Sequence, residues 1–256
     1  MENKTGNVFV ADTIKNLEIR VETASVVVKK AVDELIRVEV ENLQREENLQ
    51  DIDYTCEVQD QKLIVIYRVK GKKHLINFDW KEVQVILYLP EGKTFEHIVL
   101  EIGAGELDMR GVAISCHDMV AEIGAGKLRV AHLSVTGRLD MQIGAGEAKM
   151  KETSVGILCL ECGVGSCIYE GCVTKDIKVN CGVGSCKFHL NNKESEFDYD
   201  VSCALGSVRI NKNSIQCLGS RKISSSNNVD RVAILKCGLG SIELDTEGET
   251  KAAVHV

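Results

Sequence analysis

The chain has 256 residues, 11 cysteines and a formal net charge of −7, and aromatic residues make up 4% of it. The acidic balance and the lack of a basic cluster argue against a nucleic-acid partner, and so few aromatic rings argue against a stacking platform for bases or sugars. No run of about 18 apolar residues occurs, so the sequence predicts no membrane-spanning helix.

The first residues, MENKTGNVFVADTIKNLEIRVETASVVV, lack the basic, apolar and cleavage-site regions of a signal peptide. We therefore expect a cytoplasmic protein. The alternative is the cell surface, reached by an export route that is not visible in the sequence.

Alternation of apolar and polar residues, the period of a β-strand, begins within residues 7–41. The stretch LEIRVETASVVVKK reads as a degenerate first repeat with Ala24 and Ser25 at its bend. A polar surface loop or short helix is expected over 42–53. Three strand-like runs follow, YTCEVQ, KLIVIYRV and EVQVILYLP, and the last of them ends at Pro90. We expect residues 1–95 to form irregular N-terminal coils and a cap.

Seven copies of one pattern fill residues 98–246: an alternating run, a bend of small residues, and a second short alternating run. The copies read LEIGAGELDM, AEIGAGKLRV, MQIGAGEAKM, LECGVGSCIY, VNCGVGSCKF, VSCALGSVRI and LKCGLGSIEL. Successive bends are 21, 20, 19, 19, 22 and 34 residues apart. Repeats of about 20 to 50 residues are typical of solenoids, propellers and arrays.

This repeat predicts an all-β fold, a single-chain parallel β-solenoid with coils of about 20 residues. Each copy has one apolar face, which it buries only by stacking on its neighbours. We expect one domain over residues 1–256, with the regular coils over 96–256. An insertion at 211–230 lengthens one coil and is expected to form a surface loop, and the closing IELDTEGETKAAVHV is expected to cap the open edge of the stack.

The bends are expected to be structural corners that bind no ligand. Glycine permits positive φ and lets neighbouring coils approach closely. The middle bend residue is always apolar, from Ala104 to Leu239, and we expect it to point into the core. The predicted structural glycines are Gly103, Gly105, Gly124, Gly126, Gly144, Gly146, Gly163, Gly165, Gly182, Gly184, Gly206, Gly238 and Gly240.

Most of the cysteines stand where other copies of the repeat have buried aliphatic residues, so we interpret them as reduced packing residues. These packing cysteines are Cys162, Cys167, Cys181, Cys186, Cys203 and Cys237. Oxidised pairs and a metal or cluster site are the alternatives. Cysteines stacked in adjacent coils, about 4.8 Å apart, are within disulfide range.

No catalytic, cofactor-binding or metal site is predicted. The Gly-x-Gly bends lack the third glycine and the following helix of a dinucleotide site. Cys116 and His117 are the only adjacent cysteine and histidine, and we expect that histidine to be solvated. The carboxylates Glu101, Glu106, Asp108 and Glu122 stand at outward strand positions beside Lys127 and Arg129, and we expect them to be solvated ladder charges.

The run VQVILYLPEGKTFEHIVLEIGAGELDM, followed by repeated I-G-A-G and C-G-V-G-S, resembles the bacterial putative-adhesin family, a domain of unknown function. Leu89 and Pro90 match the family's LP element, and the bends match its glycine repeats. The resemblance covers residues from about 7 to the end. It implies a right-handed parallel β-solenoid or roll without an assigned enzymatic activity.

The function expected from these features is a non-enzymatic β-solenoid scaffold, adhesin-like, that binds an unknown protein partner or associates with itself, without a cofactor. A cell-surface adhesin or carbohydrate-binding module is the alternative. A glycan-active enzyme is the second alternative, and it would require a site that no motif in the chain supplies.

Overall fold

The computed structural model describes residues 5–41, 52–69, 83–211, 213–215, 219–222 and 229–247. Within these residues the fold is all-β, as predicted, with two short 3-10 helices, η1 (Ala11–Thr13) and η4 (Glu194–Glu196). The strands are β1 (Thr5–Val10), β2 (Asn16–Val21), β3 (Ser25–Lys30), β4 (Leu35–Glu41), β5 (Ile52–Gln59), β6 (Lys62–Val69), β7 (Gln84–Leu89), β8 (Lys93–Ile102), β9 (Glu106–Gly111), β10 (Ile114–Ile123), β11 (Lys127–Ala131), β12 (Leu133–Ile143), β13 (Glu147–Cys162), β14 (Ser166–Val173), β15 (Ile177–Cys181), β16 (Ser185–Lys193), β17 (Asp198–Cys203), β18 (Ser207–Ile210), β19 (Asn213–Ile215), β20 (Gly219–Lys222), β21 (Val232–Cys237) and β22 (Ser241–Glu247).

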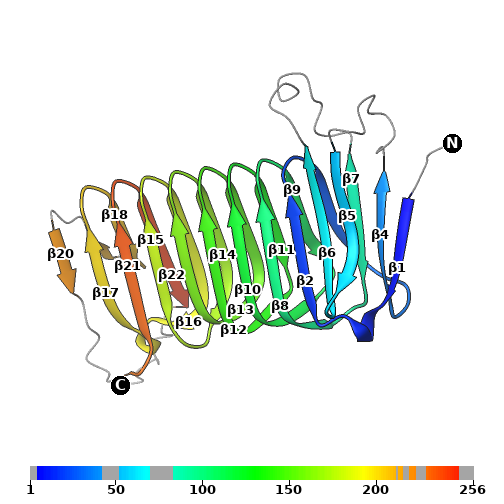
Figure 1. The fold of residues 1–256 in the computed structure, drawn as a ribbon. Helices are drawn as coiled ribbons and strands as arrows, with labels where there is room; N and C mark the ends of the chain where they lie inside the picture. Colours follow the sequence, from blue (N-terminus) through cyan, green and yellow to red (C-terminus); the bar gives the residue numbers. More distant parts are fainter. Residues whose placement is uncertain are drawn as a thin grey trace.

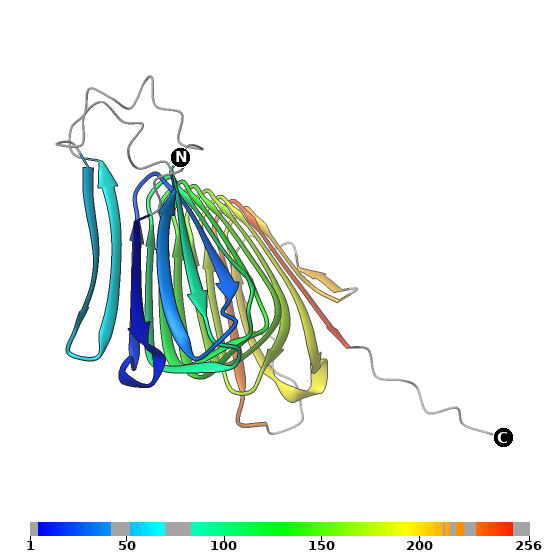
Figure 2. The same cartoon turned by 90° about the vertical axis from the view of Figure 1, so that its right-hand side faces the viewer.

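The strands form a stack of flattened coils (Figure 1), and Figure 2 looks along that stack. One row of paired strands runs β5, β6, β2, β8, β10, β12, β13, β15, β21, β17, β20, and a second runs β1, β4, β7, β3, β9, β11, β13, β14, β16, β22, β18, β19. The long strand β13 belongs to both rows, because its start pairs with β11 and β14 and its end pairs with β12 and β15. Pairing is parallel through the middle of each row and antiparallel at the ends.

At the N-terminal end of the stack, the order of coils in space differs from their order in the sequence. Strand β2 lies between β6 and β8, and β3 lies between β7 and β9. The early coil predicted around Ala24 is therefore present. Along the stack it lies between the coil formed by β6 and β7 and the coil formed by β8 and β9. The antiparallel strands β5, β4 and β1 close this end.

At the other end the last coil is also internal. Strand β21 lies between β15 and β17, and β22 lies between β16 and β18. The prediction that the closing segment caps the stack is therefore wrong for its described part. The edge is instead covered by β19 and β20, two antiparallel strands within the expected insertion, whose residues 212, 216–218 and 223–228 lie outside the described part. Antiparallel additions of this kind protect an exposed strand edge.

The core consists of columns of side chains that repeat from coil to coil. Strand residues alternate between buried and outward positions, so each coil contributes the same positions to the interior. The last strand residue before the bend forms one column, which in spatial order is Val21, Ile102, Ile123, Ile143, Cys162, Cys181, Cys237 and Cys203. A second column after the bend is Val26, Leu107, Leu128, Ala148, Cys167, Cys186, Ile242 and Val208.

The bend glycines are required by close packing between coils, and the predicted positive φ is wrong. Among the described glycines, positive φ occurs at Gly92 and Gly171, neither of which lies in a bend. A Cβ on Gly165 would lie 2.3 Å from the carbonyl oxygen of Gly146 in the preceding coil. That distance is closer than any side chain tolerates. The bends approach so closely because they stack through backbone hydrogen bonds such as Gly165 N–H to Gly144 O, 3.0 Å.

Two polar arrangements interrupt the apolar interior near the middle of the stack. The hydroxyl of buried Tyr169 donates to the carbonyl oxygens of Thr153 (3.2 Å) and Cys172 (2.8 Å). Buried Asn192 accepts a hydrogen bond from the N–H of Val173 (2.8 Å) and donates to its carbonyl oxygen (3.0 Å). These bonds satisfy backbone groups where the regular ladder is interrupted.

Candidate functional site

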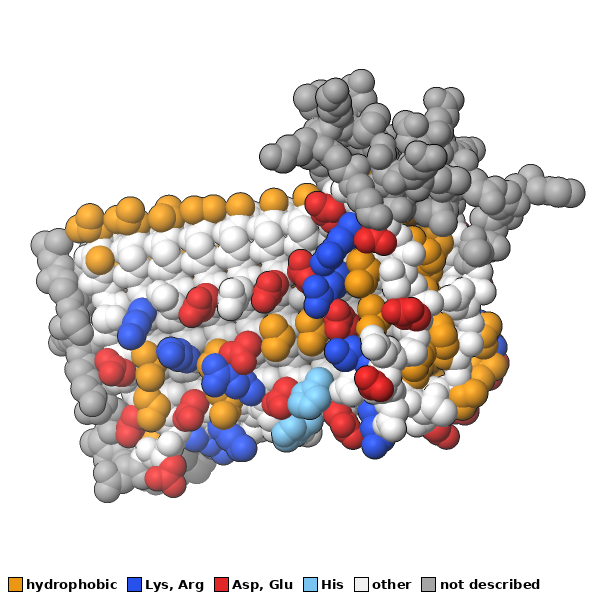
Figure 3. All heavy atoms as spheres, viewed as in Figure 1, with side chains coloured by type: hydrophobic (Ala, Val, Ile, Leu, Met, Phe, Trp, Pro, Cys, Tyr) orange, Lys and Arg blue, Asp and Glu red, His pale blue; other side chains and the backbone are white. Residues whose placement is uncertain are grey.

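The middle residues of the bends form an exposed apolar row, which we call the bend ridge. In spatial order it consists of Ala104, Ala125, Ala145, Val164, Val183, Leu239 and Leu205. Figure 3 shows this row along the upper edge of the stack. Val164, Val183, Leu239 and Leu205 are 64%, 57%, 59% and 70% exposed.

The sequence-based expectation that these residues point inward is wrong, for a steric reason. In the bend of Gly163, Val164 and Gly165, the buried position is taken by Gly165. Cys162 and Cys167 already fill the interior on either side. The middle side chain therefore has room only on the convex, solvent side of the corner.

An open groove of about 730 Å³ runs beside the bend ridge. The second glycine of each bend and the residue that follows it line this groove, so the lining repeats from coil to coil. The lining comprises Ala125, Gly126, Lys127, Ala145, Gly146, Glu147, Val164, Gly165, Ser166, Val183, Gly184, Ser185, Leu239, Gly240 and Ser241. The serine hydroxyls form a ladder, in which Ser241 donates to Ser185 at 3.2 Å.

Of the four outward carboxylates, Glu101 and Glu106 make ion pairs with basic residues on neighbouring coils, and Asp108 pairs with Arg110 on its own strand. Glu101 lies 3.3 Å from Arg20, and Glu106 pairs with Arg129. Hydrogen bonds from Arg110, the closest at 2.6 Å, hold the pKa of Asp108 below its ordinary value. A general acid at neutral pH requires the opposite shift, so Asp108 is not suited to that role.

The one adjacent cysteine and histidine do not form a nucleophile and base. Cys116 is buried, and burial raises the pKa of its thiol to about 12. His117 is exposed on the other face of β10, where its ring lies 3.2 Å from the hydroxyl of Thr136. Strand alternation thus separates the two side chains.

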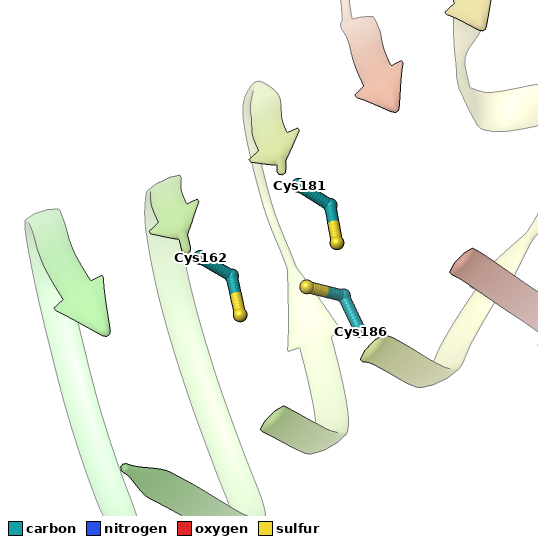
Figure 4. A group of neighbouring side chains, drawn as sticks. All are labelled: Cys162, Cys181 and Cys186. Atoms are coloured by element: carbon teal, nitrogen blue, oxygen red, sulfur yellow. The ribbon is translucent and has the colours of Figure 1, made fainter. Parts of the chain in front are cut away.

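Three cysteines converge inside the coils, directly beneath the bend ridge. Cys162 ends β13 and Cys181 ends β15, and they face Cys186 at the start of β16 (Figure 4). Their three sulfur atoms lie within 4.8 Å of one another, and the side chains are 3%, 0% and 0% exposed. This group has the donor type and spacing of a site for a soft metal ion.

The other predicted packing cysteines continue this sulfur-rich region. Cys167 pairs with Cys186 in register, Cys237 pairs with Cys181, and Cys203 pairs with Cys237. All three are buried. The described cysteines carry free thiols, whereas Cys217 lies outside the described residues.

The thiols of the three-cysteine group interact with one another. Interaction with the neighbouring thiols of Cys181 and Cys186 lowers the pKa of Cys162. The same interaction raises the pKa of Cys181 and of Cys186.

Sequence reasoning recognised the stacking of Cys162 on Cys181 but missed their approach to Cys186. The two cysteines within each C-G-V-G-S-C segment are separated by a bend, and the closest group combines residues from two successive segments. The signal that indicates it is the occurrence of this segment in consecutive coils, which places four thiols at one corner.

Comparison with known proteins gives a family and distant structural relatives. Residues 14–230 match the family model described as Toastrack DUF4097. A search of curated proteins found no match. Among the described residues, no helix has the length and apolar character needed to span a membrane.

Three solved structures resemble the chain at low identity. A putative adhesin from Bacteroides fragilis NCTC 9343 is 12% identical, with a TM-score of 0.46 over 94% of this chain and 96% of that chain. A putative adhesin from Parabacteroides distasonis ATCC 8503 is 14% identical, with a TM-score of 0.41 over 94% and 96%. A putative cell adhesion protein from Clostridium sporogenes ATCC 15579 is 12% identical, with a TM-score of 0.38 over 96% and 100%.

The names of these structures contradict the cytoplasmic location expected from the sequence. Adhesins and cell adhesion proteins are proteins of the cell surface, and we withdraw the cytoplasmic assignment. The expectation depended on one type of export signal, and the lack of that signal says nothing of other routes.

The resemblance found in the LP element and the glycine bends is confirmed by the match over residues 14–230. The chain belongs to the Toastrack DUF4097 family.

Proposed function

We propose that this chain is a non-catalytic, adhesin-like module at the cell surface that binds a protein partner along the bend ridge. The proposal takes residues 1–256 as one domain, a parallel β-solenoid of about 20-residue coils with antiparallel strands at both ends. A continuous cluster of buried apolar residues from Ala11 to Leu244 supports a single domain.

The observation that carries the proposal is the row of exposed Val and Leu side chains on the bend ridge. A contiguous exposed apolar strip on a folded protein is typical of an interaction site. The bend glycines that line the groove beside it allow close approach of a partner's backbone. Charged side chains lie mainly on other parts of the face in view (Figure 3), so a partner gives up little charge hydration when it docks on the ridge.

The chemistry of the ridge favours protein over carbohydrate and over catalysis. Sugar-binding surfaces use aromatic rings, whereas the ridge consists of Ala, Val and Leu. The lowered pKa of Asp108 and the raised pKa of Cys116 support a role without acid–base or nucleophilic chemistry.

The proposal is tested with a triple ridge variant, Val164→Ser, Val183→Ser and Leu239→Ser. Peptides selected from a random display library on the wild-type protein are titrated against each protein. We expect apolar peptides that bind the ridge variant at least tenfold more weakly, a loss of about 1.4 kcal/mol or more. Stability should change little, because substitutions at exposed positions cost about 0.5 kcal/mol or less each.

A matched control carries Val8→Ser, Val32→Ser and Val58→Ser, three equally apolar residues that are exposed elsewhere on the molecule. It should bind like the wild type. Peptides that bind the ridge variant and the wild type equally well would contradict the proposal. Sedimentation of the wild type as a dimer that the ridge variant does not form would identify the partner as a second copy.

A further inference from the structure

We propose that Cys162, Cys181 and Cys186 form a binding site for a single Cu(I) ion inside the coils. This site is separate from the bend ridge, and the inference does not depend on the proposed partner binding. Donor type, donor spacing and coordination number all support it.

The spacing of the three sulfur atoms fits one shared ion. A metal–sulfur bond is about 2.3 Å long, so three sulfurs in a plane around one ion lie about 4.0 Å apart. The three Sγ atoms here are within 4.8 Å of one another. Loading therefore requires side-chain adjustments of a fraction of an ångström, without rearrangement of the coils.

The number and type of donors favour Cu(I) over Zn(II). Thiolates select soft ions, and both metals are candidates on that ground. Structural Zn(II) takes four ligands in a tetrahedron, whereas the group offers three sulfurs, and within the described part of the chain no histidine or carboxylate joins them. The buried side chains also leave little room for water as a fourth ligand. Cu(I) is satisfied by the three sulfurs alone.

The region around the group is also rich in sulfur. Cys167 stacks on Cys186 and Cys237 stacks on Cys181, so further thiols border the site on two sides. In the earlier coils these columns carry Ile143 and Ala148. The aliphatic pattern thus changes to sulfur in both facing columns within the same two coils.

Two sulfurs of the site lie close to glycines of the groove. The Sγ of Cys162 lies 2.8 Å from the position that a Cβ on Gly184 would occupy, and the Sγ of Cys181 lies 3.0 Å from the corresponding position on Gly240. Both glycines line the groove beside the bend ridge. These two sulfurs therefore lie directly against the backbone of glycines that line the groove.

Binding is a ligand exchange without a redox step. Each sulfur that binds as a thiolate forms a Cu–S bond and releases its proton to solvent, so affinity falls as the pH is lowered.

The test is an anaerobic titration of the reduced, full-length protein with Cu(I) in competition with bicinchoninate. We expect the wild type to remove one Cu(I) from the chelator, with sulfur-only coordination in X-ray absorption and a rise in melting temperature. Cys186→Val should bind at least tenfold more weakly, and Val208 shows that valine fits this column. Cys159→Ser, on the same strand as Cys162 but half-exposed, is the control and should bind like the wild type.

Four outcomes would overturn the assignment. They are a wild type that removes no Cu(I), a Cys186→Val variant that binds as tightly as the wild type, oxygen or nitrogen in the first coordination shell, and preference for Zn(II) over Cu(I). The X-ray absorption measurement needs only the wild type, so it decides the question even where Cys186→Val does not fold.

Discussion

Gly171→Ala is expected to reduce the free energy of unfolding by more than about 4 kcal/mol, the range reserved for severe core defects. Gly171 has a φ of +153°, and a Cβ there would lie 1.8 Å from the carbonyl oxygen of Thr153. That oxygen also accepts the hydrogen bond from Tyr169. The alanine would thus push apart β13 and β14 and break a buried hydrogen bond. Urea unfolding followed by circular dichroism measures the loss.

Gly92→Ala separates backbone strain from the steric clash. Gly92 also has positive φ, +70°, but nothing lies within 4 Å of the position that a Cβ would occupy there. We expect this control to lose only about 1–2 kcal/mol, the cost of left-handed backbone for a residue with a Cβ. Equal losses in the two variants would show that contact with Thr153 is not what makes Gly171 necessary.

Asn192→Ala is expected to cost about 2–6 kcal/mol, because it removes both hydrogen bonds to the backbone of Val173 in the interior, at about 1–3 kcal/mol for each buried group left unsatisfied. The substitution also removes the hydrogen bond that the Asn192 side chain donates to Glu196 (3.0 Å), a residue of the η4 turn. Thermal and urea unfolding of the purified variant measure the effect.

The neighbouring Asn191→Ala is the matched control, since Asn191 is exposed and the same atoms are deleted. Its free energy of unfolding should stay within about 0.5 kcal/mol of the wild type. A loss of similar size in both variants would mean that asparagine acts through local strand propensity and not through Val173.

The sequence predicts the coils well because the information for them is local. Each bend and its two strands lie within about ten residues, and the alternation on both sides is visible in every copy. The order of the coils along the stack, by contrast, cannot be predicted from local sequence. The apolar positions of the last copy, Ile242 and Leu244, fit against those of almost any other coil, so periodicity alone does not reveal that β22 lies between β16 and β18.

The candidate site was predicted only in part, for a related reason. The apolar nature of Val164 and Leu239 suggested burial, and only the stacked backbone shows that the second bend glycine occupies the inward position. The cysteines were placed in the core from the column they share with isoleucine, and the structure places them there. The approach of Cys186 to Cys162 depends on side-chain direction across a corner, which sequence spacing does not determine.

The interleaved order of the last coils has a mechanical consequence. Strand β22, near the C-terminal end, is held by parallel ladders on both sides, against β16 and against β18. A pulling force on that end loads both ladders in shear at once, so the chain cannot be peeled away one coil at a time.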